Sequence, residues 1–244
     1  MSVKVTLVIP SIRPRYWYFF SKAIEKSRIP CEILFIGPNK GDWENLPKNV
    51  HYIETSVKVS QCFHIGFNYA KGELVAWSPD DVFYYPGAID FIYDAWLKGN
   101  KEDVYCPRII EDNKETTYSH TLWQLSKYPM MAPFGFLGKD YLINKIGGVD
   151  SKFEGTEWEN DVVLRVYENG GKVSIVENAW VEFNETEYLK YTKFKDTGIQ
   201  GRLLIKDLWL DEYGNIVKRK YPVQKFNNTY EQILIHTQES WVPS

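Results

Sequence analysis

The chain has 244 residues, of which 44% are hydrophobic and 25% charged, a composition that suits one globular domain and excludes extensive disorder. The formal net charge of −3 excludes a strong overall attraction to nucleic acid or to an anionic membrane. No apolar run approaches the ~18 residues of a membrane span and no signal peptide is visible, so we expect a cytoplasmic protein with no membrane span.

The first half of the chain alternates between strand patterns and helix patterns. Short β-branched, apolar runs predict buried strands at residues 3–9, 31–36, 50–54 and 74–77. Amphipathic segments between and after them predict helices at residues 15–27, 59–71 and 87–98. This alternation indicates an α/β fold with a mostly parallel sheet and helices on both faces.

The loops that follow these strands are the first candidates for a binding site. Ligands of parallel sheets bind beyond the carboxyl ends of the strands. The loops at 10–14, 37–42 and 78–82 therefore share one rim of the predicted sheet.

The second half is less regular and predicts a small mixed sheet. Strand patterns cover residues 104–110, 116–122 and 172–183, and helix patterns cover 139–146, 161–169 and part of 186–210. Tyr213-Gly214-Asn215 is a predicted turn.

Two adjacent carboxylates, Asp80 and Asp81, end the strand at 74–77. Their mutual repulsion is relieved most easily by a bound cation, and a hard divalent ion such as Mg²⁺ or Mn²⁺ that bridges to a diphosphate meets that need. The alternative is a turn capped by aspartate, which is common after strands.

A second acidic segment, Glu157-Trp158-Glu159-Asn160-Asp161, lies at a predicted helix start. A carboxylate there could act as a general base toward an acceptor hydroxyl. Two simpler interpretations stay open: acidic groups favour helix N-termini, and Asp161 can pair with Arg165 four residues on.

Other residues carry weaker signals. Gly135-Phe136-Leu137 could form a floor under a sugar ring, although core packing is the default interpretation. The three cysteines show no spacing typical of zinc or of a disulfide framework. None of the four histidines has metal-ligand spacing, but the late His236 could fold back onto a metal.

The order of these motifs resembles that of GT-A glycosyltransferases, especially the inverting group called family 2. The similar segments are V-T-L-V-I-P-S-I-R-P-R-Y, I-G-F-N-Y-A-K-G-E-L-V-A-W-S-P-D-D with Y-Y-P-G-A-I-D, A-P-F-G-F-L-G-K-D-Y-L-I-N-K-I-G-G-V-D and W-E-N-D-V-V-L-R-V-Y-E-N-G-G. The resemblance covers about residues 3–180. It implies a GT-A catalytic domain at 1–185, with 186–244 as a C-terminal extension that packs on the same domain.

The resemblance also implies roles for single residues. Asp81 would bind the metal, and Asp80 would touch the metal or the ribose. Glu159 stands at the position of the catalytic base, with Asp161 as the second acid of that segment. The nucleotide site would be lined by Pro10, Ser11, Arg13 and Asn39.

Several positions depart from the family pattern. Gly37-Pro38-Asn39 replaces the usual acidic residue after the second strand, Phe63-His64 replaces an Arg-Asn pair, and Glu159 stands where aspartate is commoner.

The sequence thus predicts a metal-dependent, inverting hexosyl- or pentosyltransferase that uses a nucleotide-diphosphate sugar. A nucleotidyltransferase of related fold is disfavoured because the first loop, I-P-S-I-R-P-R-Y, has no glycine. The other alternative is a non-catalytic protein of the same fold that binds sugar nucleotides or glycans. The acceptor stays open among glycans, lipid-linked glycans, proteins, small molecules and modified DNA. Residues 186–225, with nine Lys/Arg against five Asp/Glu, would suit a phosphate backbone.

Overall fold

The structure is a computed structural model that describes residues 2–41, 45–111, 113–116, 132–183, 195–227 and 234–236. Within these ranges, no helix combines the length and the apolar character that crossing a bilayer requires.

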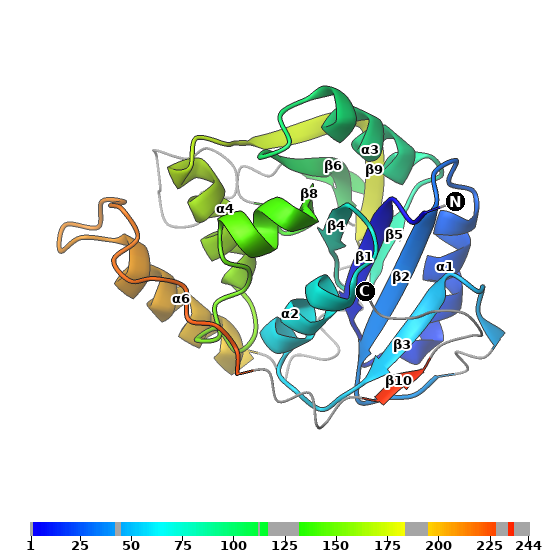
Figure 1. Ribbon diagram of the computed structural model, residues 1–244, viewed down its shortest axis with the longest axis horizontal. Helices are drawn as coiled ribbons and strands as arrows, with labels where there is room; N and C mark the ends of the chain where they lie inside the picture. Colours follow the sequence, from blue (N-terminus) through cyan, green and yellow to red (C-terminus); the bar gives the residue numbers. More distant parts are fainter. Residues whose placement is uncertain are drawn as a thin grey trace.

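Four parallel strands form one half of the central sheet, in the order β3-β2-β1-β4 (Figure 1). They are β1 (Val5–Pro10), β2 (Cys31–Gly37), β3 (Val50–Glu54) and β4 (Leu74–Trp77), which confirms the predicted strands. The helices between and after them are α1 (Trp17–Glu25), preceded by the 3-10 turn η1 (Pro14–Tyr16), α2 (Val59–Tyr69) and α3 (Ala88–Lys98).

Helices α1 and α2 cover opposite faces of this sheet. Phe20 of α1 packs edge-on against Phe35 of β2. On α2, a Cβ added to Gly66 would lie 2.2 Å from Val8 and 2.7 Å from Ile36, so the helix backbone almost touches the strands. Phe35 and Ile36 are neighbours in one strand and therefore point to opposite faces. The expected coverage of both faces is confirmed.

The other half of the sheet is mixed, and it continues from β4 in the order β8-β6-β9-β5. Its strands are β5 (Val82–Tyr84), β6 (Val104–Glu111), β7 (Lys114–Thr116, paired with β6), β8 (Gly135–Gly138) and β9 (Val173–Phe183). Strands β5 and β8 were not predicted because each is too short for an alternating pattern. Of the strand expected at 116–122, the part after Thr116 lies outside the described residues. The helix expected at 139–146 is a single π-helical turn, η4 (Tyr141–Lys145).

Helix α4 (Trp158–Glu168) begins three residues before the predicted start, which brings Glu159 into its first turn. Helix α6 (Lys195–Trp209) lies beside α4, at the edge of the molecule farthest from α1 (Figure 1). The short strand β10 (Leu234–His236) pairs antiparallel with β3 and extends the sheet. The predicted turn at 213–215 contains Gly214 at φ 81°.

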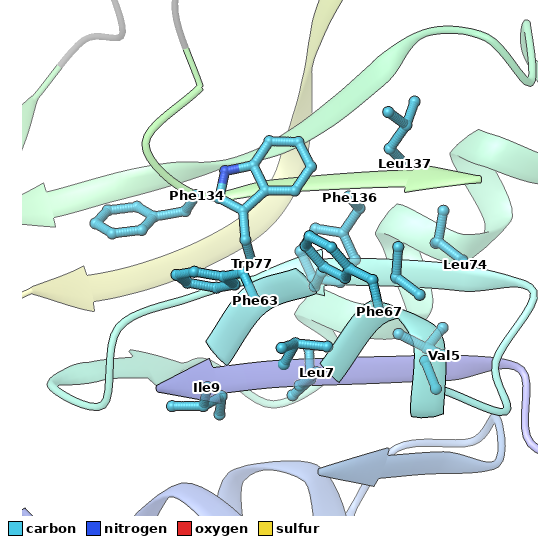
Figure 2. Close-up of a cluster of buried hydrophobic side chains, with 14 of the residues drawn as sticks. Val5, Leu7, Ile9, Phe63, Phe67, Leu74, Trp77, Phe134, Phe136 and Leu137 are labelled. Carbon is cyan, nitrogen blue, oxygen red and sulfur yellow. The ribbon is translucent and has the colours of Figure 1, made fainter. Parts of the chain in front are cut away.

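Phe63 and Phe67 of α2 and Trp77 at the end of β4 lie together in the core (Figure 2). Trp158 of α4 packs against Phe63, with ring centroids 4.4 Å apart. The Trp77 indole nitrogen donates to the carbonyl of Ala132 at 2.8 Å, and its ring meets Trp158 edge-on at 5.9 Å. A Cβ at Gly135 would lie 2.3 Å from the Trp77 ring, so only glycine lets β8 pass there. Phe136 and Leu137 are fully buried, which supports core packing rather than a sugar-binding floor.

Candidate active site

Three loops meet at the carboxyl edge of the parallel strands, as the sequence predicts. The side-chain amide of Asn39, after β2, donates to the carbonyl of Ile12, after β1, at 2.9 Å. A Cβ at Gly37 would lie 2.0 Å from the carbonyl oxygen of Ser11, so this close approach requires glycine. Pro10 ends β1 in register with Ile36 and begins the first loop.

Asp80 joins the first loop to the loop after β4. The Ser11 hydroxyl donates to Oδ2 of Asp80 at 2.6 Å and accepts a hydrogen bond from the Trp17 indole at 2.7 Å. The backbone N–H of Arg13 also donates to Oδ2 of Asp80, at 3.2 Å. Asp80 is 3% exposed, so these bonds fix a buried carboxylate at the rim.

The guanidinium of Arg13 bridges the two carboxylates. Its Nε donates to Oδ1 of Asp80 at 2.8 Å, and its Nη2 contacts both that oxygen and, at 2.9 Å, Oδ2 of Asp81. The sequence analysis placed Arg13 at the nucleotide site but did not reveal that its guanidinium would offset part of the charge of the acidic pair.

Asp81 is the residue of this group best suited to hold a cation. It is 2% exposed, and neither of its carboxylate oxygens has a hydrogen-bond partner of good geometry. Burial raises the pKa of Asp81, and the charge of Arg13 opposes that rise. A buried, under-satisfied carboxylate beside a second acid fits a hard divalent ion. Among the described residues, however, no cluster of three or more His, Cys, Asp or Glu side chains forms a complete metal site.

The strand position of His236 separates it from this pair. His236 lies in β10, opposite Tyr52 of β3, and β3, β2 and β1 intervene before β4. Four strand spacings correspond to about 19 Å. The sheet therefore does not bring the backbone of His236 to Asp81.

The start of α4 lies close to the end of β4. Trp158, the first residue of α4, contacts Trp77, the last residue of β4. Glu159 follows Trp158 directly, and Asp80 comes three residues after Trp77. The packing of two indole rings thus connects the two acidic segments.

Glu159, the predicted base, has a raised pKa. It is half-buried in the first turn of α4. Burial, with a further contribution from the charge of Glu157, raises the pKa of Glu159 to about 7, although backbone N–H groups at Glu157 and Glu159 favour the charged form. A carboxyl group with a pKa near neutrality can accept a proton and release it again.

Glu157 holds the loop before α4 in a rare conformation. Its φ is 74°, in the left-handed region that non-glycine residues seldom adopt, and it is 6% exposed. Its carboxylate accepts from Asn160 at 2.7 Å and from Arg202 of α6 at 3.3 Å. Such conformations persist only where several contacts hold them, and they cluster at functional sites.

Asp161 lies in a buried ion network rather than at the rim. Its carboxylate contacts Nη2 of Arg165 at 3.0 Å, the Trp209 indole nitrogen at 2.8 Å and Nε of Arg219 at 2.9 Å. Arg219 also contacts Oδ2 of Asp150 at 2.5 Å. With both oxygens engaged, Asp161 is placed to orient α4 rather than to take a proton. The expected pair with Arg165 is present, whereas the parts played by Trp209 and Arg219 carried no sequence signal.

Comparisons with known proteins bear on the fold. No protein-family model matches the chain, and no curated protein matches it. A structure of GalNAc-T7 with UDP, GalNAc and Mn²⁺ matches with a TM-score of 0.64 and 15% identity, over 87% of this chain and 49% of that chain. A structure of the 1–349 portion of S. aureus TarS matches with a TM-score of 0.55 and 14% identity, over 81% of this chain and 65% of that chain.

The chain thus spans about half of the GalNAc-T7 chain and just under two thirds of the TarS chain. Both neighbours are glycosyltransferases, and the low identity means that the likeness concerns the fold. Together with the strand order and the rim, these matches show that the chain has the GT-A fold.

Proposed function

We propose that the protein transfers a sugar from a nucleotide-diphosphate donor to an acceptor hydroxyl, with inversion at the anomeric carbon. The observation that carries this proposal is the contact between Trp77 and Trp158, which joins the elements that carry two acidic segments with different properties. Asp80 and Asp81 are buried at the rim, while Glu159, half-buried and with a pKa of about 7, lies in the first turn of the adjoining helix.

The donor is assigned to the rim formed by the loops after β1, β2 and β4. Ser11 and Asp80 are rigidly held there, and Asn39 stands where an acidic residue would recognise a base or ribose. Asp81 with Asp80 would hold Mn²⁺ or Mg²⁺, which when bound supplies positive charge next to the departing diphosphate. GalNAc-T7, a neighbour in fold, was solved with UDP and Mn²⁺.

Glu159 is assigned the role of the base. Its carboxylate takes the proton from the acceptor hydroxyl while that oxygen forms a bond to the anomeric carbon. The bond from the anomeric carbon to the phosphate oxygen breaks, and its electron pair leaves with the nucleoside diphosphate. Orientation of donor and acceptor by fixed side chains contributes to the rate.

A non-catalytic protein that binds sugar nucleotides is the second candidate. It is favoured by Asn39 in place of an acid and by the ion pairs of Arg13 with Asp80 and Asp81, which occupy the predicted metal ligands. The raised pKa of Glu159 favours the enzyme, because carboxyl groups with strongly shifted pKa values cluster at catalytic sites.

The donor site is tested by thermal unfolding with a panel of nucleoside diphosphates, with and without Mn²⁺. A ligand at about 100 times its Kd stabilises the folded state by about 2.7 kcal/mol, or roughly 5–11 °C for a chain of this size. We expect one nucleotide to give this shift with Mn²⁺. Asp81→Ala should abolish it, and Asp207→Ala, which removes an exposed acid of α6, should not. If no nucleotide shifts the transition under either condition, the donor site is wrongly assigned.

A further inference from the structure

Arg13 occupies the position at which a cation would bind the acidic pair. Its guanidinium contacts both carboxylates, and the three side chains are 10%, 4% and 3% exposed for Arg13, Asp80 and Asp81. The two acids and one arginine leave a formal charge of −1. The site therefore carries its own monovalent counter-ion.

This arrangement leaves a divalent ion few places to bind. Oδ1 of Asp80 and Oδ2 of Asp81 both face Arg13, and Oδ2 of Asp80 accepts from Ser11. Of the four carboxylate oxygens, Oδ1 of Asp81 is the one that lies outside these contacts. One oxygen is far short of the roughly six ligands that Mg²⁺ or Mn²⁺ takes, and the nearby guanidinium repels a second cation.

A bound diphosphate would remove both obstacles. Phosphate oxygens supply the missing metal ligands, and they offer the guanidinium a new bidentate acceptor. The Tyr16 ring lies beside the Arg13 guanidinium, with its centre 5.6 Å from Cζ, and also contacts the Arg15 guanidinium at 4.8 Å.

We propose that Arg13 is an exchangeable counter-ion. When donor and metal bind, its guanidinium moves from Asp80 and Asp81 to the diphosphate, and the divalent ion takes its place at the two carboxylates. The coupling of metal and nucleotide rests on the donor site assigned above, but the competition between Arg13 and the ion does not. Metal alone then binds weakly, and metal and nucleotide bind cooperatively. The coupling is reciprocal, so each ligand raises the affinity for the other by the same factor.

The first experiment measures Mn²⁺ binding without nucleotide, by electron paramagnetic resonance of the free ion. We compare the wild type with Arg13→Met, which keeps the apolar stem and removes the charge. Arg15→Met is the matched control, because Arg15 stands two residues away and its guanidinium contacts Tyr16. Arg13→Met should bind Mn²⁺ at least about tenfold more tightly than the wild type, because the variant lacks the positive charge that repels the ion from the site. Equal Kd values for the wild type and Arg13→Met overturn the proposal.

The second experiment needs no variant and covers the case in which Arg13→Met does not fold. Calorimetry gives the Kd of the wild type for UDP, GDP and dTDP, each with and without Mn²⁺. At least one nucleotide should bind more tightly with the metal, and unchanged affinities for a nucleotide that does bind overturn the proposed coupling. If none of the three binds at all, the donor site fails, and the comparison of Mn²⁺ affinities still decides whether Arg13 competes with the ion.

Discussion

Replacing Glu159 by Gln should change the stability of the folded protein and its sugar-transfer activity in opposite directions. Burial raises the pKa of Glu159 from 4.5 to about 7. Because the folded-state pKa lies above the ordinary value, the charged form opposes folding. This cost is absent below pH 4.5, grows between pH 4.5 and 7 and is constant above pH 7. At about 1.4 kcal/mol per pKa unit, its upper limit is about 3–4 kcal/mol.

We therefore expect Glu159→Gln to be more stable than the wild type above pH 7 and equally stable below pH 4.5, while sugar transfer is lost. The measurement is urea unfolding across this pH range, with activity assayed on the same samples. Glu212→Gln removes an exposed carboxylate and should change neither property. A stability difference that does not vary with pH would refute the reasoning, because it would show that the Glu159 carboxylate is not charged at a desolvated site.

Three other substitutions test the surroundings of this base. Glu157→Gln removes the like charge beside Glu159, so the rise of kcat/KM with pH should move to lower pH; an unmoved profile would show that Glu157 does not act on the base. Gly201→Ala should destabilise the folded protein by about 1–3 kcal/mol, since the added Cβ would lie 2.4 Å from a backbone oxygen. Gly198→Ala in the same helix has its nearest contact at 3.5 Å and should stabilise the protein slightly. Equal effects of the two variants in thermal unfolding would contradict the close packing of α6. Arg219→Met leaves the buried carboxylates of Asp150 and Asp161 with one counter-charge fewer and should lower the free energy of unfolding by about 3–5 kcal/mol. The exposed Lys218→Met should change it by almost nothing. A loss below ~1 kcal/mol for Arg219→Met would contradict the buried network.

Much of the fold could be predicted because local patterns determine it. The buried strands of the parallel half are short apolar runs closed by Pro10, Gly37 and Ser78, and parallel connection places those ends on one edge. The acidic pair after β4 lies at that edge for the same reason. The mixed half was harder, since β5 and β8 are three and four residues long and take their strand form from pairing with β9 and β4.

The contacts within the site depend on side chains that are distant in sequence. Arg13 and Asp80 are 67 residues apart, and Trp209 and Arg219 lie 48 and 58 residues from Asp161. No local periodicity reports such partners. The Asp161–Arg165 pair could be predicted because it joins neighbouring turns of one helix. The raised pKa of Glu159 depends on burial that only the folded chain creates.

The most direct test of the proposed function is the release of nucleoside diphosphate from a panel of nucleotide sugars, in the presence of Mn²⁺. The proposal predicts that the wild type consumes at least one donor, by transfer or by slow hydrolysis. Asp81→Ala and Glu159→Gln should fail to do so, and Asp207→Ala should behave like the wild type. If the wild type binds a nucleotide sugar but consumes none with any acceptor, the chain is a binding protein with the GT-A fold, and the catalytic assignment of Glu159 is wrong.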